Sequence, residues 1–143
     1  MSGRKIDEVH LIRLQMERVE HAMKLNELRD ICYKQAVKHG WHETTRSVGD
    51  LIALMHSELS EALEEHRKGK KPDEVYYNDP PLGDPHALHK AYSKPEGIPI
   101  ELADVIIRIF DFCGRYDIDI DKAIALKIAY NDLRPYRHGG KVL

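Results

Sequence analysis

Proline is distributed so unevenly along this chain that it limits where helices can form. Six of the seven prolines lie in residues 69–99. A proline inside a helix removes a backbone hydrogen bond and clashes with the preceding turn, so this segment cannot be one continuous helix. We expect a long loop, and loops of this length within a compact domain are often lids or binding loops. A variable surface excursion would explain the segment equally well.

Apolar residues on both sides of this loop recur every three to five positions, the spacing that is typical of helices. No segment alternates convincingly between polar and apolar residues as a strand would, and no internal repeat is present. The predicted fold class is therefore all-α, with helices over about residues 5–24, 26–39, 47–68, 100–115 and 120–132.

Residues suited to helix ends support these boundaries. Asn26, Ser47 and Asp119 are of the types that cap helix N-termini, because their side-chain oxygens accept hydrogen bonds from free backbone N–H groups. Gly40 and Gly69 follow the predicted ends of two helices, where glycine is the preferred residue. The sequence thus predicts both the helices and several of their caps.

Length and charge set further limits. The 143 residues, 42% of them hydrophobic, suit a single domain spanning residues 1–143. Lys and Arg total 22 against 24 Asp and Glu, giving a net charge of −2, so no global basic field indicates nucleic acid as a partner. An anionic ligand would have to be bound locally.

Neither a membrane nor an oxidising compartment is indicated. The sequence contains no apolar stretch of membrane-spanning length, and its first ten residues, MSGRKIDEVH, have no apolar core of signal-peptide length. Cys32 and Cys113 fall in predicted helices and form no metal-binding motif, so we expect buried thiols. The expected location is the cytoplasm.

Carboxylates interrupt the apolar face of the helix predicted over residues 47–68. On a helical projection, Glu58 falls between the directions of Leu51 and Leu54, and Glu61 and Glu65 lie at the edge of the same arc. Removing water from a carboxylate costs several kcal/mol unless the group is paired or binds a metal. These glutamates are therefore candidates for a function.

The helix predicted over residues 100–115 is apolar nearly all round, as expected for the centre of a bundle. Its polar residues form one narrow stripe, made by Glu101, Asp104, Arg108 and Asp111. Arg108 could pair with Asp104 and Asp111 in an ordinary ion network, and glutamate-rich helices are usually solvated.

Two helices thus each offer an acid pair at i, i+3, the spacing that places both side chains on one face. The pairs are Glu58 with Glu61 and Glu101 with Asp104. Magnesium prefers oxygen ligands and commonly keeps waters and substrate phosphates in its coordination shell. Four facing carboxylates suit that chemistry.

The segments SELSEALEEHR and IELADVIIRIF resemble the paired ExxE and ExxD motifs of the MazG-like, all-α nucleoside triphosphate pyrophosphohydrolases. NELRDICYKQAVKHGW resembles the family's first helix and the aromatic residue after it. KIAYNDLRPYRHGGK resembles its closing K-x-x-x-N and basic tail. The likeness covers roughly residues 26–68 and 100–141.

The resemblance implies a helical bundle that acts as a homodimer or homotetramer and hydrolyses a (deoxy)nucleoside triphosphate to the monophosphate and pyrophosphate. It implies Mg²⁺, with Mn²⁺ as an alternative ion, bound by Glu58, Glu61, Glu101 and Asp104. It also implies a catalytic residue that orients the attacking water, for which Glu61 and Glu65 are both candidates.

The same resemblance implies substrate-binding residues outside the acid pairs. Tyr33, Trp41 and His42 lie where the family shapes its base pocket, although an aromatic residue near a helix end is more often part of a core. The implied contacts to the phosphates or sugar come from the last helix and the tail, at Lys127, Asn131, Arg134, Arg137, His138 and Lys141. A frayed basic terminus would explain the tail equally well.

The chain departs from the family's compact members in two places. Residues 69–99 form a much longer connection between the acid pairs, with Tyr76, Tyr77 and Tyr92 as candidates for base stacking, and residues 1–25 form a helical extension. The same residues would also suit a phosphoribosyl-ATP hydrolase or a dCTP/dUTP-type hydrolase, which differ in the base pocket. A non-catalytic helical oligomerisation module is the alternative from a different class of protein.

Overall fold

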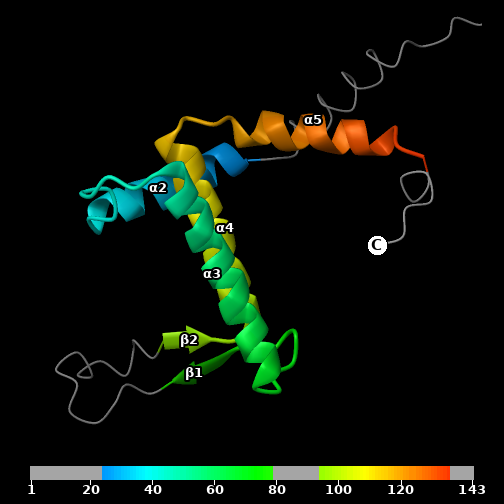
Figure 1. Ribbon diagram of the computed structural model, residues 1–143. Helices are drawn as coiled ribbons and strands as arrows, with labels where there is room; N and C mark the ends of the chain where they lie inside the picture. The colour runs from blue at the N-terminus through cyan, green and yellow to red at the C-terminus, as the bar shows by residue number, and fades with distance from the viewer. Residues whose placement is uncertain (1–23, 79–93, 136–143) are drawn as a thin grey trace, which may run out of the picture.

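The computed structural model describes residues 24–78 and 94–135 (Figure 1). Within these ranges the protein is mostly helical, as predicted, but it also contains a small antiparallel sheet that the sequence did not predict. The elements are α2 (Leu25–Lys38), α3 (Val48–Arg67), β1 (Tyr76–Asn78), β2 (Lys94–Glu96), α4 (Ile98–Arg115) and α5 (Ile120–Asp132). No described helix combines the length and apolar character needed to cross a membrane.

Helix α4 is the centre of the arrangement. It packs against α3 along its length and against α2 near its C-terminal end (Figure 1). Cys32 of α2 and Cys113 of α4 are buried free thiols, as predicted. Gly114 allows the close approach of α2, because a Cβ at this position would clash with the side chain of Tyr33.

The start of α3 follows from its local sequence. Ser47 is the N-cap, as predicted: its Oγ accepts from the backbone N–H of Asp50 at 3.1 Å, and the Asp50 carboxylate accepts from the backbone N–H of Ser47 at 3.0 Å. This reciprocal capping box satisfies two backbone donors that the helix itself leaves free. Gly69, with φ of +83°, follows the end of α3 in the left-handed conformation that glycine tolerates.

The prediction that Asn26 caps α2 is wrong, because Asn26 lies inside this helix. Its side chain acts on α5 instead, accepting from the backbone N–H of Ile120 at 3.0 Å and donating to Asp119 at 2.9 Å. In return, the Asp121 carboxylate accepts from the backbone N–H groups of Leu25 and Asn26 at 2.9 and 3.2 Å. The two helices thus cap each other, while Asp119 caps α5 as predicted.

Part of the segment predicted to be a loop is a β-ribbon. Tyr76 pairs with Glu96 and Asn78 with Lys94. Each strand has three residues, which is too short to show alternation in the sequence. Helix α4 begins at Ile98, two residues earlier than predicted, because Pro99 occupies its first turn, where no backbone donor is required.

Several sequence-based predictions lie outside the described residues. They concern the helical extension up to residue 23, the stretch 79–93 that contains Tyr92, and the tail from residue 136 onward.

Candidate metal centre and adjoining cavity

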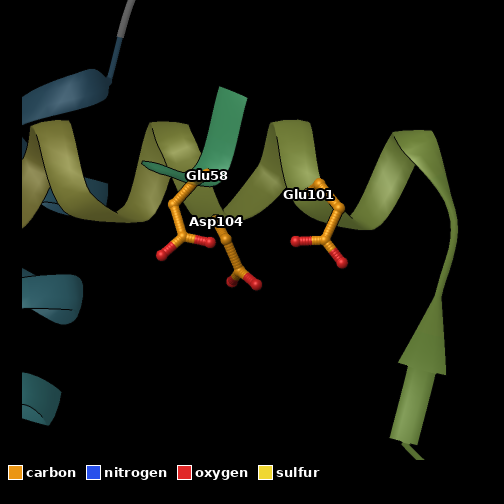
Figure 2. A group of neighbouring side chains, drawn as sticks. All are labelled: Glu58, Glu101 and Asp104. Carbon is orange, nitrogen blue, oxygen red and sulfur yellow. The ribbon is translucent and has the colours of Figure 1, made fainter. Parts of the chain in front are cut away.

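Three carboxylates meet where α3 crosses the first half of α4. Glu58 comes from α3, and Glu101 and Asp104 come from successive turns of α4. Each contributes one oxygen, and these oxygens lie within 4.8 Å of one another. Figure 2 shows the three carboxyl groups pointing to the same side of α4.

The carboxylate cluster of Glu58, Glu101 and Asp104 is poorly solvated. Glu101 is 3% exposed and Glu58 is 6% exposed. Burial raises the pKa of Glu101, and the nearby charge of Glu61 raises it further. Burial likewise raises the pKa of Asp104, with the charge of Glu58 as the next contribution. Both effects disfavour the ionised carboxylates, whereas a cation placed among the oxygens would favour them.

Arg108 joins the two helices at one edge of the cluster. Its Nε donates to Glu58, rather than forming the network with Asp104 and Asp111 that the sequence left open. Among the described residues, no ion pair reaches Glu101 or Asp104. The cluster therefore carries more negative charge than the described cations pair with.

Glu61 and Glu65 have different surroundings, although both lie on α3. Glu61 is exposed and close enough to Glu101 to raise its pKa. Glu65 is buried and accepts from Lys68 at 2.7 Å and from the Tyr76 hydroxyl at 2.9 Å. These bonds hold the pKa of Glu65 below its usual range. Glu65 thereby ties the β-ribbon to α3.

A cavity of about 310 Å³ adjoins the cluster and is bounded by α2, α3, α4 and the segment after α2. Glu58 and Asp104 contribute to its wall, so the cavity and the cluster are continuous. Apolar surface comes from Leu51 and Leu54, and Trp41 also contributes to the lining. A partly apolar hollow that also carries charged groups is typical of sites for small molecules.

His42 also lines this cavity, and its hydrogen bonds define its tautomer. Arg115 donates to Nδ1 of His42 at 3.1 Å, so that nitrogen must be the acceptor. Nε2 then carries the hydrogen and donates to Asp111 at 2.7 Å. The ring also makes an edge contact with Tyr33, with the centroids 5.1 Å apart. These contacts fix the orientation of His42 at the cavity wall.

The predicted phosphate-binding residues of the last helix are not part of this cluster. Lys127 and Asn131 are exposed on α5, which packs against α2 and is directed away from the α3–α4 pair in Figure 1. Arg134 follows α5, and its guanidinium lies 6.0 Å from the centre of the Tyr130 ring. The predicted tail residues Arg137, His138 and Lys141 lie outside the described residues.

Lys94 and Glu96 were missed by reasoning from the sequence. Both lie on β2, and their side chains are 3.0 Å apart between Nζ and Oε1. Their charges act on the carboxylate cluster, because Lys94 lowers and Glu96 raises the pKa of both Glu101 and Asp104. The only signal in the sequence was their position a few residues before Glu101.

A scan against protein-family models, a search of curated proteins and a search of solved structures each found no match to this chain. Its function must therefore be inferred from the geometry of the cluster and the cavity.

Proposed function

We propose that this protein is a magnesium-dependent nucleotide pyrophosphohydrolase that converts a (deoxy)nucleoside triphosphate to the monophosphate and pyrophosphate. The observation that supports this most directly is the continuity of two features. A largely buried carboxylate cluster adjoins a partly apolar cavity of about 310 Å³. Such a pair of features suits a ligand with a flat, weakly polar part and a highly charged part.

The donor set fits Mg²⁺. Glu58, Glu101 and Asp104 would supply oxygen ligands, and a bound cation would compensate the charge of Glu101, which is buried and has no ion pair with another described residue. Glu61, the fourth acid implied by the family resemblance, is beside Glu101 and exposed, so it could approach a bound ion. When bound, Mg²⁺ would neutralise phosphate oxygens, and Mn²⁺, which accepts similar ligands, could replace it.

Glu61 is better placed than Glu65 to orient the attacking water. Glu65 is already bonded to Lys68 and Tyr76, and its lowered pKa makes it a weak base. In the proposed step, the water oxygen bonds to the α-phosphorus and its proton passes to Glu61. The bond between the α-phosphorus and the bridging oxygen breaks, and pyrophosphate leaves with that electron pair.

The cavity would hold the base and the sugar. Trp41 offers a ring face at the cavity wall, and Arg46, whose guanidinium lies 5.4 Å from the centre of that ring, also lines the cavity. The ordered carboxylate and imidazole of Asp111 and His42 offer polar contacts to base edges. A phosphoribosyl-ATP hydrolase or a dCTP/dUTP-type hydrolase would use the same cluster with a different occupant of this cavity.

A second subunit would explain the position of Lys127 and Asn131. Both are exposed on a helix that points away from the cluster of its own chain, so in a homodimer or homotetramer they could serve a neighbouring site. Exposed apolar residues on α3, namely Val48, Ile52, Leu59 and Leu63, support an assembly of this kind. Their spacing of four, seven and four residues places them on one face of the helix.

The same apolar face favours a second candidate function, a helical oligomerisation module without catalysis. In that case the buried acids would only lower the free energy of unfolding and would bind no ligand. Substituting Glu101 by Gln would then leave every ligand measurement unchanged, whereas the proposed enzyme would lose both metal binding and hydrolysis.

The test is pyrophosphate release from a panel of canonical and damaged ribo- and deoxyribonucleoside triphosphates, with Mg²⁺ and with EDTA. Glu101→Gln should lower the rate by at least about a hundredfold, because a metal ligand is lost. Glu64→Gln is the matched control, since Glu64 is an exposed acid of α3 that pairs only with Arg67 among the described residues. Absence of metal-dependent release from every substrate, with folded protein, would reject the proposal.

A further inference from the structure

The junction between β2 and α4 fixes the β-ribbon relative to the carboxylate cluster. Gly97 connects them with φ of +116°, a conformation that side chains strongly disfavour. A Cβ at Gly97 would also clash with the backbone carbonyl of Glu74. Glu65 holds the opposite strand through Tyr76. Figure 2 shows β2 on the side of α4 toward which the three carboxyl groups point.

Lys94 is an exposed cation beside this cluster. Side chains two residues apart on a strand share one face, which places Lys94 next to Glu96 at 3.0 Å. The Lys94 side chain is 66% exposed, so little packing restrains it. Its charge partly offsets the burial that raises the pKa of Glu101 and Asp104. Lys94 therefore lies near both carboxylates without an ion pair to either.

The cavity, the carboxylate cluster and Lys94 follow one another in this order from the C-terminal half of α4 to the residues that precede the helix. Asp111 and Asp104 line the cavity, Asp104 and Glu101 belong to the cluster, and Lys94 precedes the helix. With a rise of about 1.5 Å per residue, Asp111 and Glu101 are about 15 Å apart along the axis. An extended ligand with its base in the cavity and its phosphates over the cluster would end near Lys94.

We infer that Lys94 binds the terminal phosphate of the substrate and thereby makes the site select nucleoside triphosphates over diphosphates. The inference depends on the proposed function, because it takes the phosphate chain to lie over the carboxylate cluster. Lysine suits this position, since a flexible side chain with a compact charge can leave Glu96 and follow the phosphate. Lys94 acts on binding and on the leaving pyrophosphate, and it takes no proton from the attacking water.

Three affinities of Lys94→Gln should respond differently. Affinity of the Mn²⁺-loaded protein for the α,β-imido triphosphate of its best substrate should fall about tenfold, as expected when one charge-assisted hydrogen bond is lost. Affinity for the corresponding diphosphate should change less than about twofold. Mn²⁺ alone should bind as tightly or up to about fivefold more tightly, because a neighbouring positive charge has been removed.

Lys71→Gln removes another exposed lysine near the ribbon and is the matched control, while Lys94→Arg should retain the preference for triphosphate. Equal losses for triphosphate and diphosphate, weaker Mn²⁺ binding, or values equal to those of Lys71→Gln would overturn the inference. The proposed function is tested separately: it is rejected if the wild type binds Mn²⁺ but hydrolyses no nucleotide. The affinities for ATP and ADP would then replace those for the best substrate, and a loss of affinity for ATP alone in Lys94→Gln would still show that Lys94 binds the terminal phosphate.

Discussion

Arg108 and Glu58 form an ion pair between α4 and α3 at the point where the carboxylate cluster meets the cavity. The Glu58 side chain is 7% exposed and that of Arg108 is 31% exposed, so the carboxylate is the more desolvated partner. Because Glu58 is also one of the three clustered acids, the same residue connects the packing of the two helices to the charge of the candidate site. Breaking this pair should therefore change both the free energy of unfolding and the response of the protein to a metal ion.

Arg108→Ala should destabilise the metal-free protein by about 1–3 kcal/mol, since it leaves Glu58 buried without its cation. Mg²⁺ should recover more stability in the variant than in the wild type, because the ion then supplies the missing positive charge. Urea denaturation in EDTA and in Mg²⁺ measures both effects. Arg67→Ala breaks an exposed pair on α3 and should cost less than about 1 kcal/mol. Equal responses of the two variants would contradict the assigned role of Arg108.

Features that depend on local sequence could be predicted, and features that depend on tertiary contacts could not. Ser47 and Asp119 were found as caps because each bonds to a backbone group three residues away. Asn26 has the same residue type, but its partners lie more than ninety residues along the chain. Residue type and spacing alone carry no information about such pairs.

The candidate site shows the same division. The acids were identified because Glu58 and Asp104 interrupt apolar helical faces, which is a periodic signal. The difference between Glu61 and Glu65 depends on Tyr76 of the β-ribbon, which the sequence placed in a loop. No periodic pattern could show that a turn at Gly97 brings Lys94 to the cluster.

The reciprocal capping of α2 and α5 predicts the effect of a substitution far from the cluster. Asp121→Ala removes the acceptor for the first two N–H groups of α2 and should cost about 1–2 kcal/mol. Mn²⁺ affinity should stay within about twofold, because α3 and α4 are unaffected. Urea denaturation and Mn²⁺ titration measure the two quantities, and Asp132→Asn, at an exposed position of α5, is the control. A loss of stability no larger than in this control would show that the caps do not hold α2 and α5 together.

The raised pKa of Glu101 predicts how stability depends on pH. An acid whose pKa is higher in the folded state than in the unfolded state favours folding while it is protonated, and this contribution is lost as pH rises between the two values. Glu101→Gln should therefore stabilise the metal-free protein at pH 7, and the gain should shrink as pH falls through the raised pKa toward the ordinary carboxyl range.

Denaturation of wild type and Glu101→Gln across this pH range in EDTA measures the difference directly. Glu65→Gln should show the opposite sign, because the pKa of Glu65 is lowered by Lys68 and Tyr76 and its ionised form stabilises the fold at pH 7. Repeating the comparison in Mg²⁺ should abolish the advantage of Glu101→Gln, since a bound ion favours the ionised carboxylate. An advantage that persists unchanged with Mg²⁺ would argue against Glu101 as a metal ligand.

A substitution at Trp41 tests the role of the cavity independently of the carboxylate cluster. Its side chain is 51% exposed, so truncation to Ala removes little core packing and should leave the free energy of unfolding nearly unchanged. A ring that stacks on a base contributes roughly 1–3 kcal/mol to binding, so the KM of the best substrate should rise about tenfold or more.

Mn²⁺ affinity should not change in Trp41→Ala, because Trp41 contributes no ligand to the cluster. Trp41→Phe, which keeps a ring face, should recover most of the affinity, whereas Ile31→Ala, at an exposed position of α2 outside the cavity lining, should alter neither quantity. If KM stayed constant in Trp41→Ala while Glu101→Gln still abolished hydrolysis, the phosphates alone would provide recognition, and the cavity would have to be assigned to something other than the base.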